Sequence, residues 1–366
     1  RRKGLPEDAA TLFAVWKGRR ELEQKRKATI VDVAKLAGVS VATVSRVVNA
    51  NYPVKEETRT RVQAAIKELD YVPNVQAREL NTRRSSTIGV VVPGLYNMFF
   101  AQVIDGIEDY LRQDDYSLLL NCAKNDPKQE MKCITALVSR NVSGIIVISP
   151  NTAHIKESFY TQLVRRTPLV FINAYHYIPD VSYVGNDEAL GTQEALRHLM
   201  QLGHQRILFV RGANSDSYQI KEDTFRVVMR GRGIQPDRYI VNVGEGNSAE
   251  TVDDTQQALM GALPQTDATA VFCCNDLMGV GALNACKALN LRVPDDISVM
   301  GFDNIALARY VSPKLTTMDQ NMFRLGSNAA QLLIERIENG PCKRITLDNV
   351  LVKRESTGRA PIRIES

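Results

Sequence analysis

The chain has 366 residues, which is too long for one ordinary domain and suits two or three. Its composition is that of a soluble globular protein, and no run approaches the roughly 18 to 20 uncharged apolar residues that a membrane span needs. The six cysteines show no C-x-x-C spacing and do not cluster with the four histidines, so we expect reduced thiols, no metal site and no cofactor.

Positive charge is concentrated near the N-terminus. Residues 1–86 carry 18 Lys and Arg against 10 Asp and Glu, whereas the rest of the chain carries 28 against 31. A basic segment joined to a near-neutral one indicates a polyanion-binding module, although an ordinary solvated surface could have the same charge. Residues 1–28 match no pattern, and we expect this N-terminal extension to be disordered.

The segment that begins at Thr29 predicts two short helices separated by a tight turn. Thr29 followed by Asp32 has the spacing of a capping box, so a short helix should start near Ile30. Gly38 marks the turn, where a residue without Cβ is favoured, and Ser40 is a good N-cap for the second helix. This arrangement is typical of a helix-turn-helix unit.

The second helix of the pair has two distinct faces. Val44, Val47 and Val48 form an apolar side that can pack on the first helix. The opposite side is small and polar, with one arginine, and consists of Val41, Ala42, Ser45, Arg46 and Asn49. Small side chains let a helix approach the bases, and an arginine can donate two hydrogen bonds to a guanine edge. This side is therefore predicted to read the major groove of DNA.

A third helix is predicted by an apolar stripe at helical spacing. The stripe consists of Val62, Ala65, Ile66 and Leu69. Such a stripe is the mark of core packing, and we expect this helix to close a three-helix core. In this helix only Thr58 and its basic neighbours are candidates for contact with phosphate.

These motifs resemble the headpiece of the LacI/GalR family of bacterial repressors, in which D-V-A-x-x-A-G-V-S-x-x-T-V-S-R-V-(V/I)-N recurs. The chain carries D-V-A from Asp32, A-G-V-S from Ala37 and T-V-S-R-V-V-N from Thr43. The resemblance extends over residues 29–358. It implies a homodimeric transcriptional regulator whose two headpieces, each within residues 29–73, read the half-sites of a pseudo-palindromic operator.

The resemblance also implies roles for single residues of the headpiece. Arg46, with Val41 and Ala42, would read bases. Contacts to phosphate would come from Thr29, Ser40, Thr43, Ser45 and Asn49.

Residues 74–86 are expected to be a hinge helix and linker. Pro73 prevents continuation from the preceding helix, and the segment is too short to be a stable helix alone. The resemblance implies that the hinge helices of a dimer fold on the operator, where each inserts a leucine into the minor groove. The predicted contacts are Asn74, Ala77 and the inserted Leu80. The alternative is a flexible linker with an incidental leucine.

Residues 87–358 alternate short β-branched runs with amphipathic helices. The runs are 88–92, 116–122, 144–149, 168–173, 206–210, 270–275 and 297–302. Alternation of this kind predicts parallel sheets covered on both faces, and the number of strands suggests two lobes. The fold class is therefore α/β: a small all-α headpiece and a two-lobed doubly wound core, which the resemblance assigns to the periplasmic-binding-protein type. Residues 359–366 form a tail.

Polar residues at the carboxyl ends of the strands are candidates for ligand contact, because doubly wound sheets bind ligands there. These residues are Ser149, Asn173, Asn275 and Asp303, although each singly is more often a cap or turn residue. The resemblance places Asp303, in G-F-D-N, and Asn275, in N-D-x-M, in an effector pocket. It adds Phe99, Phe100, Lys221 and Gln320.

Departures from the family pattern leave the effector open among sugars, sugar derivatives and nucleosides or purines. Lys221 stands where the family usually has arginine, so the charge is kept and the planar fork is lost. The strand-end Asp-Arg pair of sugar-responsive members is replaced by Asn173-Ala174. The usual pocket aromatic falls near Gly246, so that ring is expected to be missing. Whether the effector weakens or strengthens DNA binding is undetermined.

The sequence contains no catalytic motif: G-x-S-x-G, a P-loop and G-x-G-x-x-G after the first core strand are all missing, so we expect no enzyme. The main alternative function is that of a solute-binding protein with the same core, but such proteins need export and lack a basic headpiece. We expect a cytoplasmic, nucleoid-associated protein with no membrane partner.

Overall fold

The computed structural model describes residues 28–49, 52–73, 85–151, 158–213 and 215–361. The chain divides into two compact units, Arg1–Arg84 and Ser85–Ser366. The predictions for residues 1–27 and for the hinge contacts Asn74, Ala77 and Leu80 fall outside the described residues. Within the described ranges, no helix has the length and apolar character needed to cross a bilayer.

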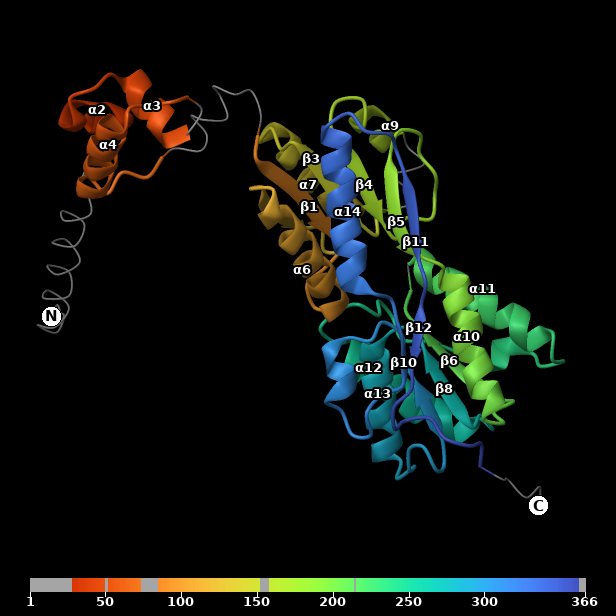
Figure 1. Ribbon diagram of the computed structural model, residues 1–366. Helices are drawn as coiled ribbons and strands as arrows, with labels where there is room; N and C mark the ends of the chain where they lie inside the picture. Colours follow the sequence, from red (N-terminus) through yellow and green to blue (C-terminus); the bar gives the residue numbers. More distant parts are fainter. Residues whose placement is uncertain (1–27, 50–51, 74–84, 152–157, 214, 362–366) are drawn as a thin grey trace, which may run out of the picture. The chain divides into compact units, whose positions relative to one another are not determined.

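The described part of the first unit consists of α2 (Ile30–Ala37), α3 (Val41–Asn49) and α4 (Glu56–Glu68) (Figure 1). Their inward side chains form one apolar core. Its buried members are Val33, Ala34, Ala37, Val44, Val62 and Ala65, with Val47, Val48, Ile66 and Leu69 partly buried beside them. The predicted three-helix core is confirmed.

The predicted helix boundaries of this unit are also confirmed. The Thr29 side chain accepts a hydrogen bond from the amide of Asp32, and the Asp32 carboxylate accepts one from the amide of Thr29, which is a capping box. Gly38 ends α2 at φ +64°, a left-handed conformation that glycine adopts without strain. The Ser40 hydroxyl accepts a hydrogen bond from the Thr43 amide at 3.1 Å and so caps α3.

The second unit has two lobes, of which the first contains a six-stranded parallel sheet in the order β11-β5-β4-β3-β1-β2. The strands are β1 (Thr87–Val92), β2 (Ser117–Cys122), β3 (Gly144–Ile148), β4 (Leu169–Ile172), β5 (Ser182–Asn186) and β11 (Arg344–Leu347). Helices cover both faces. They are α6 (Met98–Gln113) and α14 (Met322–Ile337) on one face, and α7 (Pro127–Ser139) and α9 (Phe159–Leu163) on the other.

The residues of β3 show why both faces need cover. Ile146 and Ile148 belong to the apolar cluster beneath α6 and α14, whereas Ile145 and Val147 belong to the cluster beneath α7. Successive side chains of a strand point to opposite faces. A continuous apolar run therefore fits a strand buried on both sides, as predicted.

The second lobe contains a four-stranded parallel sheet in the order β7-β6-β8-β9. Its strands are β6 (Ile207–Arg211), β7 (Ile240–Asn242), β8 (Ala270–Cys273) and β9 (Ser298–Met300). Two packed helix pairs flank it (Figure 1): α10 (Glu188–Gln201) with α11 (Asp216–Arg230), and α12 (Thr251–Ala262) with α13 (Asp276–Ala288). Short 3₁₀ turns follow at Pro236–Tyr239, Leu263–Gln265 and Ala306–Arg309.

The chain passes between the lobes at three points, which lie beside the antiparallel pair β10 (Thr317–Asp319) and β12 (Val350–Val352). The passages follow β5, β10 and β11. The amide of Asn186, at the end of β5, donates to the carbonyls of Gln320 and Leu347 at 3.1 and 3.2 Å. One side chain thus ties the three passages together.

Candidate functional site

The outward face of α3 is accessible within its own unit. Val41, Ala42 and Arg46 are exposed, whereas Val44 on the opposite side is fully buried. The guanidinium carbon of Arg46 lies 5.5 Å from the centroid of the Tyr52 ring, a cation–π contact. The small side chains and the arginine therefore share one open surface, as the sequence predicted.

Polar side chains of the headpiece are held by short-range hydrogen bonds. The Ser40 and Thr43 hydroxyls lie 2.9 Å apart, and the Asn49 amide donates to the Ser45 hydroxyl at 3.2 Å. Thr58 lies half-buried in α4. These contacts fix the direction of several groups that the family resemblance assigns to phosphate.

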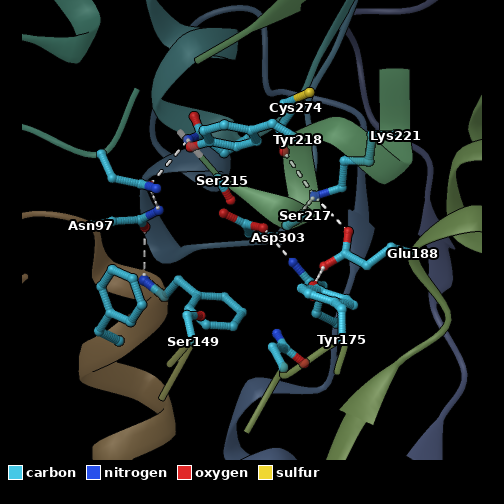
Figure 2. Close-up of a pocket in the computed structure, with 16 residues that line it drawn as sticks. Asn97, Ser149, Tyr175, Glu188, Ser215, Ser217, Tyr218, Lys221, Cys274 and Asp303 are labelled. Carbon is cyan, nitrogen blue, oxygen red and sulfur yellow. Dashed lines mark hydrogen bonds and ion pairs between the residues drawn. The ribbon is translucent and has the colours of Figure 1, made fainter. Parts of the chain in front are cut away.

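The second unit contains a cavity at the carboxyl ends of the strands of both lobes (Figure 2). Its volume is about 50 Å³. All eight predicted effector residues line this cavity: Phe99, Phe100, Ser149, Asn173, Lys221, Asn275, Asp303 and Gln320. They come from both lobes and from the passage after β10. Doubly wound sheets bind ligands at this position.

The backbone at three of these residues is left-handed: φ is +48° at Ser149, +51° at Asn173 and +117° at Asp303. Such conformations cost about 1 to 3 kcal/mol each for residues other than glycine. Each is held by a hydrogen bond from its own amide to a neighbouring strand, at 2.8, 2.9 and 2.8 Å respectively. Strain maintained in this way turns the side chains out of the strand direction and towards the cavity.

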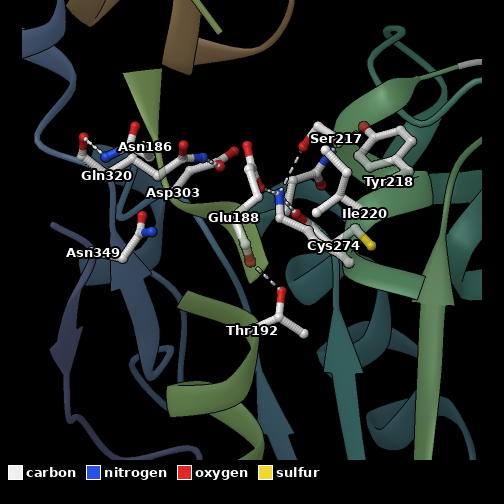
Figure 3. A network of polar contacts seen from close by, with 12 residues as sticks. Asn186, Glu188, Thr192, Ser217, Tyr218, Ile220, Cys274, Asp303, Gln320 and Asn349 are labelled. Atoms are coloured by element: carbon white, nitrogen blue, oxygen red, sulfur yellow. Dashed lines mark hydrogen bonds and ion pairs between the residues drawn. The ribbon is translucent and has the colours of Figure 1, made fainter. Parts of the chain in front are cut away.

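The cavity wall contains a buried ion pair. The Lys221 ammonium lies 2.7 Å from a carboxylate oxygen of Glu188, and both side chains are 2% exposed. The ammonium also donates to the Ser217 hydroxyl at 3.0 Å and to the carbonyl of Cys274 at 3.2 Å (Figure 3). Burial lowers the pKa of Lys221, but the nearby acids, Glu188 foremost, outweigh it, so the pKa is raised overall. The lysine is therefore charged.

Asp303 lies beside this pair and is also buried. The Gln320 amide donates to its carboxylate at 2.6 Å. Burial raises the pKa of Asp303 to about 7, although Lys221 and Gln320 act in the opposite direction. The group therefore titrates near neutral pH.

Asn275 has less freedom to bind a ligand than its motif suggests. Its oxygen accepts a hydrogen bond from the Met278 amide and caps α13. Its amide nitrogen donates to the Tyr218 hydroxyl at 3.0 Å and to the carbonyl of Gly246 at 2.8 Å. With these groups occupied, Asn275 positions the wall of the cavity.

Two aromatic wall residues, Tyr175 and Tyr218, and the acid Glu188 were not predicted from the sequence. The Tyr175 hydroxyl donates to Glu188 at 2.9 Å. The ring that the family pattern places near Gly246 is not provided there, yet Tyr175 and Tyr218 supply aromatic walls from other elements. Tyr218 precedes Lys221 by one helical turn on α11, and that spacing was a signal that could have found it.

Metal chemistry finds no support in the described ranges. No group of three or more His, Cys, Asp and Glu side chains there is placed to hold a metal ion. All six cysteines are free thiols.

A helix-turn-helix unit joined to a two-lobed core with a cavity between its strand ends defines a ligand-responsive DNA-binding regulator. Residues 29–74 match the family described as bacterial regulatory proteins, lacI family, and residues 196–357 match a periplasmic binding protein-like domain.

Whole-chain similarity covers both units. The chain is 33% identical over 322 residues to the HTH-type transcriptional repressor PurR of Aliivibrio fischeri, covering 85% of this chain and 92% of that protein. It is 31% identical over 335 residues to the ribose operon repressor of Haemophilus influenzae, covering 90% and 98%. The lac repressor dimer bound to operator and the anti-inducer ONPF has a similar structure, with TM-score 0.77, 29% identity and coverage of 91% and 100%. The chain belongs to the LacI family of bacterial transcriptional repressors.

Proposed function

We propose that this protein binds a specific operator through α3 and that a small molecule in the core cavity controls its affinity for that operator. The observation that carries the proposal is the exposed face of α3, on which Arg46 stands between small residues while Val44 anchors the helix inside. A helix with such a face can enter the major groove and donate to base edges.

Within this function, Arg46, Val41 and Ala42 read bases. Phosphates are contacted by Thr29, Ser40, Thr43, Ser45, Asn49 and Thr58. The roles of Asn74, Ala77 and Leu80 in the hinge rest on the family resemblance alone. Two copies of the chain would bind a pseudo-palindrome, and the operator-bound dimer of the similar lac repressor supports this arrangement. Because its proposed partner is bacterial operator DNA, the protein is proposed to act in the cytoplasm, at the nucleoid.

Seven of the eight predicted residues of the cavity are proposed to bind the effector, whereas Asn275 is proposed to position the wall, with Glu188, Tyr175 and Tyr218 beside it. The cavity is assigned binding and no catalysis, in keeping with relatives that are repressors. One of those relatives is a ribose operon repressor, and a similar LacI family regulator from Enterococcus faecium was solved with bound ribose. These names support a sugar among the proposed effector classes, which are sugars, sugar derivatives and nucleosides or purines.

Selection of binding sites from a random pool of DNA duplexes tests the DNA-binding role. We expect a pseudo-palindromic site to be enriched, and log affinity to fall linearly with log salt concentration. Arg46→Ala should cost about 1 to 3 kcal/mol on that site and relax preference at one base position of each half-site. Lys35→Ala removes an equal charge from an exposed position on α2 and should keep the base preference. Failure to enrich a site, or an unchanged preference in Arg46→Ala, would contradict the proposal.

A further inference from the structure

We propose, on the basis of the effector-binding role above, that the effector is an uncharged or cationic donor of hydrogen bonds, and that Glu188 excludes anions from the cavity. The matching ligands are neutral sugars, amino sugars or nucleosides. Sugar phosphates, sugar acids and nucleotides would be rejected.

The charges of the cavity wall disfavour an anionic ligand. Among the described residues that line the cavity, Lys221 is the one cation, and it faces two acids, Glu188 and Asp303. Its ammonium donates hydrogen bonds to the Ser217 hydroxyl and to the carbonyl of Cys274, and it forms an ion pair with Glu188 at 2.7 Å. An anionic ligand would have to displace one of these acceptors and lie next to buried carboxylates. Two negative charges that are neighbours in a buried site repel each other strongly, because little water is present to screen them.

Two uncharged side chains of the cavity wall favour a ligand that donates hydrogen bonds. The side-chain oxygens of Asn173 and Gln320 are buried and have no hydrogen-bond partner in the described part of the chain. Asn173 is 7% exposed and Gln320 is 3% exposed. The amide nitrogen of Gln320 faces Asp303, so its oxygen points elsewhere. Because a buried acceptor without a donor costs about 1 to 3 kcal/mol, these oxygens call for hydroxyl or amino groups on the ligand.

The apolar wall fits a ring that carries such groups. The Phe99 and Phe100 rings meet edge to face, with centroids 5.4 Å apart, and both line the cavity. Aromatic walls with a few fixed polar groups are typical of sites for small cyclic ligands. Donor-rich edges and apolar faces are found together in sugars and nucleosides.

Binding to the wild-type protein is measured by calorimetry with inorganic phosphate and with matched pairs. The pairs are ribose with ribose 5-phosphate, glucosamine with gluconate, and adenosine with its monophosphate. We expect no binding of phosphate, and within any pair that binds, the neutral or cationic member should bind more tightly. An anionic member that binds more tightly, or phosphate binding that is lost in Lys221→Met, overturns the proposal. Because the wild-type protein is used to compare the ligands, this comparison does not depend on whether a Glu188 variant folds.

The Glu188→Gln variant tests the cause. Glu188→Gln leaves Lys221 without its acidic partner, so inorganic phosphate should bind at least about tenfold more tightly than the detection limit of the wild-type titration. This binding should be lost again in Glu188→Gln/Lys221→Met. Glu222→Gln is the matched control, because Glu222 is an ion-paired acid next to Lys221 on α11 that contacts Arg211 and Arg226 and does not line the cavity. It should gain no affinity. An unchanged affinity in a folded Glu188→Gln variant, or an equal gain in Glu222→Gln, overturns the assignment.

Operator binding by the same proteins separates this inference from the proposed function. Wild-type protein that binds its selected operator but prefers anionic ligands refutes the ligand class alone. Loss of operator binding in the wild type refutes the DNA-binding function, whatever the charge of the ligand.

Discussion

Asp303 combines burial, a left-handed backbone and proximity to Glu188 and Lys221. Burial, the left-handed backbone and the neighbouring Glu188 carboxylate each cost stability, whereas the Lys221 ammonium offsets part of that cost when Asp303 is ionised. The Asp303 carboxyl lines the cavity at the carboxyl ends of the strands, where it can accept a hydrogen bond from a ligand. Residues under such constraints are commonly found at binding sites.

The raised pKa of Asp303 predicts a defined pH dependence of stability. Its folded pKa of about 7 lies above the ordinary 3.8, so its contribution is fully present below pH 3.8 and is lost as pH rises through 7. Asp303→Asn lacks this loss. Between pH 5 and pH 8 the free energy of unfolding of the variant should therefore gain roughly 2 kcal/mol relative to the wild type.

Urea unfolding of both proteins at the two pH values measures this change. Subtracting the wild type cancels titration of groups that do not interact with Asp303, such as His204, whose pKa is lowered by burial. A difference that stays constant across this range would show that Asp303 does not titrate there.

Single residues of the cavity were predictable where a strong strand preceded them. Ser149 and Asn173 follow long apolar runs, so their positions at the strand ends could be read directly. Glu188 could not be found in this way, because the strand before it, SYVGN, has too little apolar character to stand out. Its partner Lys221 was identified from the family motif, but nothing in the motif signals that the two charges meet.

At the scale of elements, α6 and α14 cross at unusually short distance. A Cβ atom added to Gly106 would lie 2.1 Å from the carbonyl oxygen of Phe323, and one added to Gly326 would lie 2.0 Å from that of Val103. Backbone therefore packs on backbone at this crossing, and only glycine fits. The contact matters for function because α6 brings Phe99 and Phe100 to the cavity and α14 follows the passage through Gln320.

Replacement of Gly326 by alanine should destabilise the core. Gly326→Ala forces the helices apart, and we expect a loss of about 1 to 3 kcal/mol in the free energy of unfolding. Gly261→Ala in α12 is the control, since a Cβ there meets no atom within 4 Å. An exposed helical site should gain roughly 0.4 to 1 kcal/mol from alanine. Urea denaturation measures the free energy of unfolding of both variants. Equal changes in Gly326→Ala and Gly261→Ala would contradict the close crossing of α6 and α14.

The sequence predicted elements in proportion to their length and burial. All seven apolar runs contain a strand, and six of these strands are buried along most of their length, which leaves a continuous apolar pattern; β2 is only partly buried. The strands β7, β10 and β12 have three residues each and lie in no long apolar run, unlike the equally short β9, which lies within the run 297–302. Their pairing is decided by tertiary contacts, which one sequence does not display.

At the scale of the whole core, a ligand would touch both lobes and the passages between them. Asn173 belongs to the first lobe, Lys221 to the second, and Gln320 to the passage after β10. The same passage is bonded to Asn186 through the carbonyl of Gln320. Ligand contact with these groups favours one arrangement of the lobes over others, which is the physical requirement for control of a distant site.

Operator affinity measured with and without ligand tests this account most directly. A ligand that raises the thermal midpoint of the wild type but not of Asp303→Ala is first found by scanning a panel of sugars, amino sugars and nucleosides. At saturation that ligand should change the operator Kd of the wild type about 5- to 150-fold, in either direction, and leave the Kd of Asp303→Ala unaltered. A ligand that fills the cavity and leaves the wild-type Kd unchanged would contradict the account.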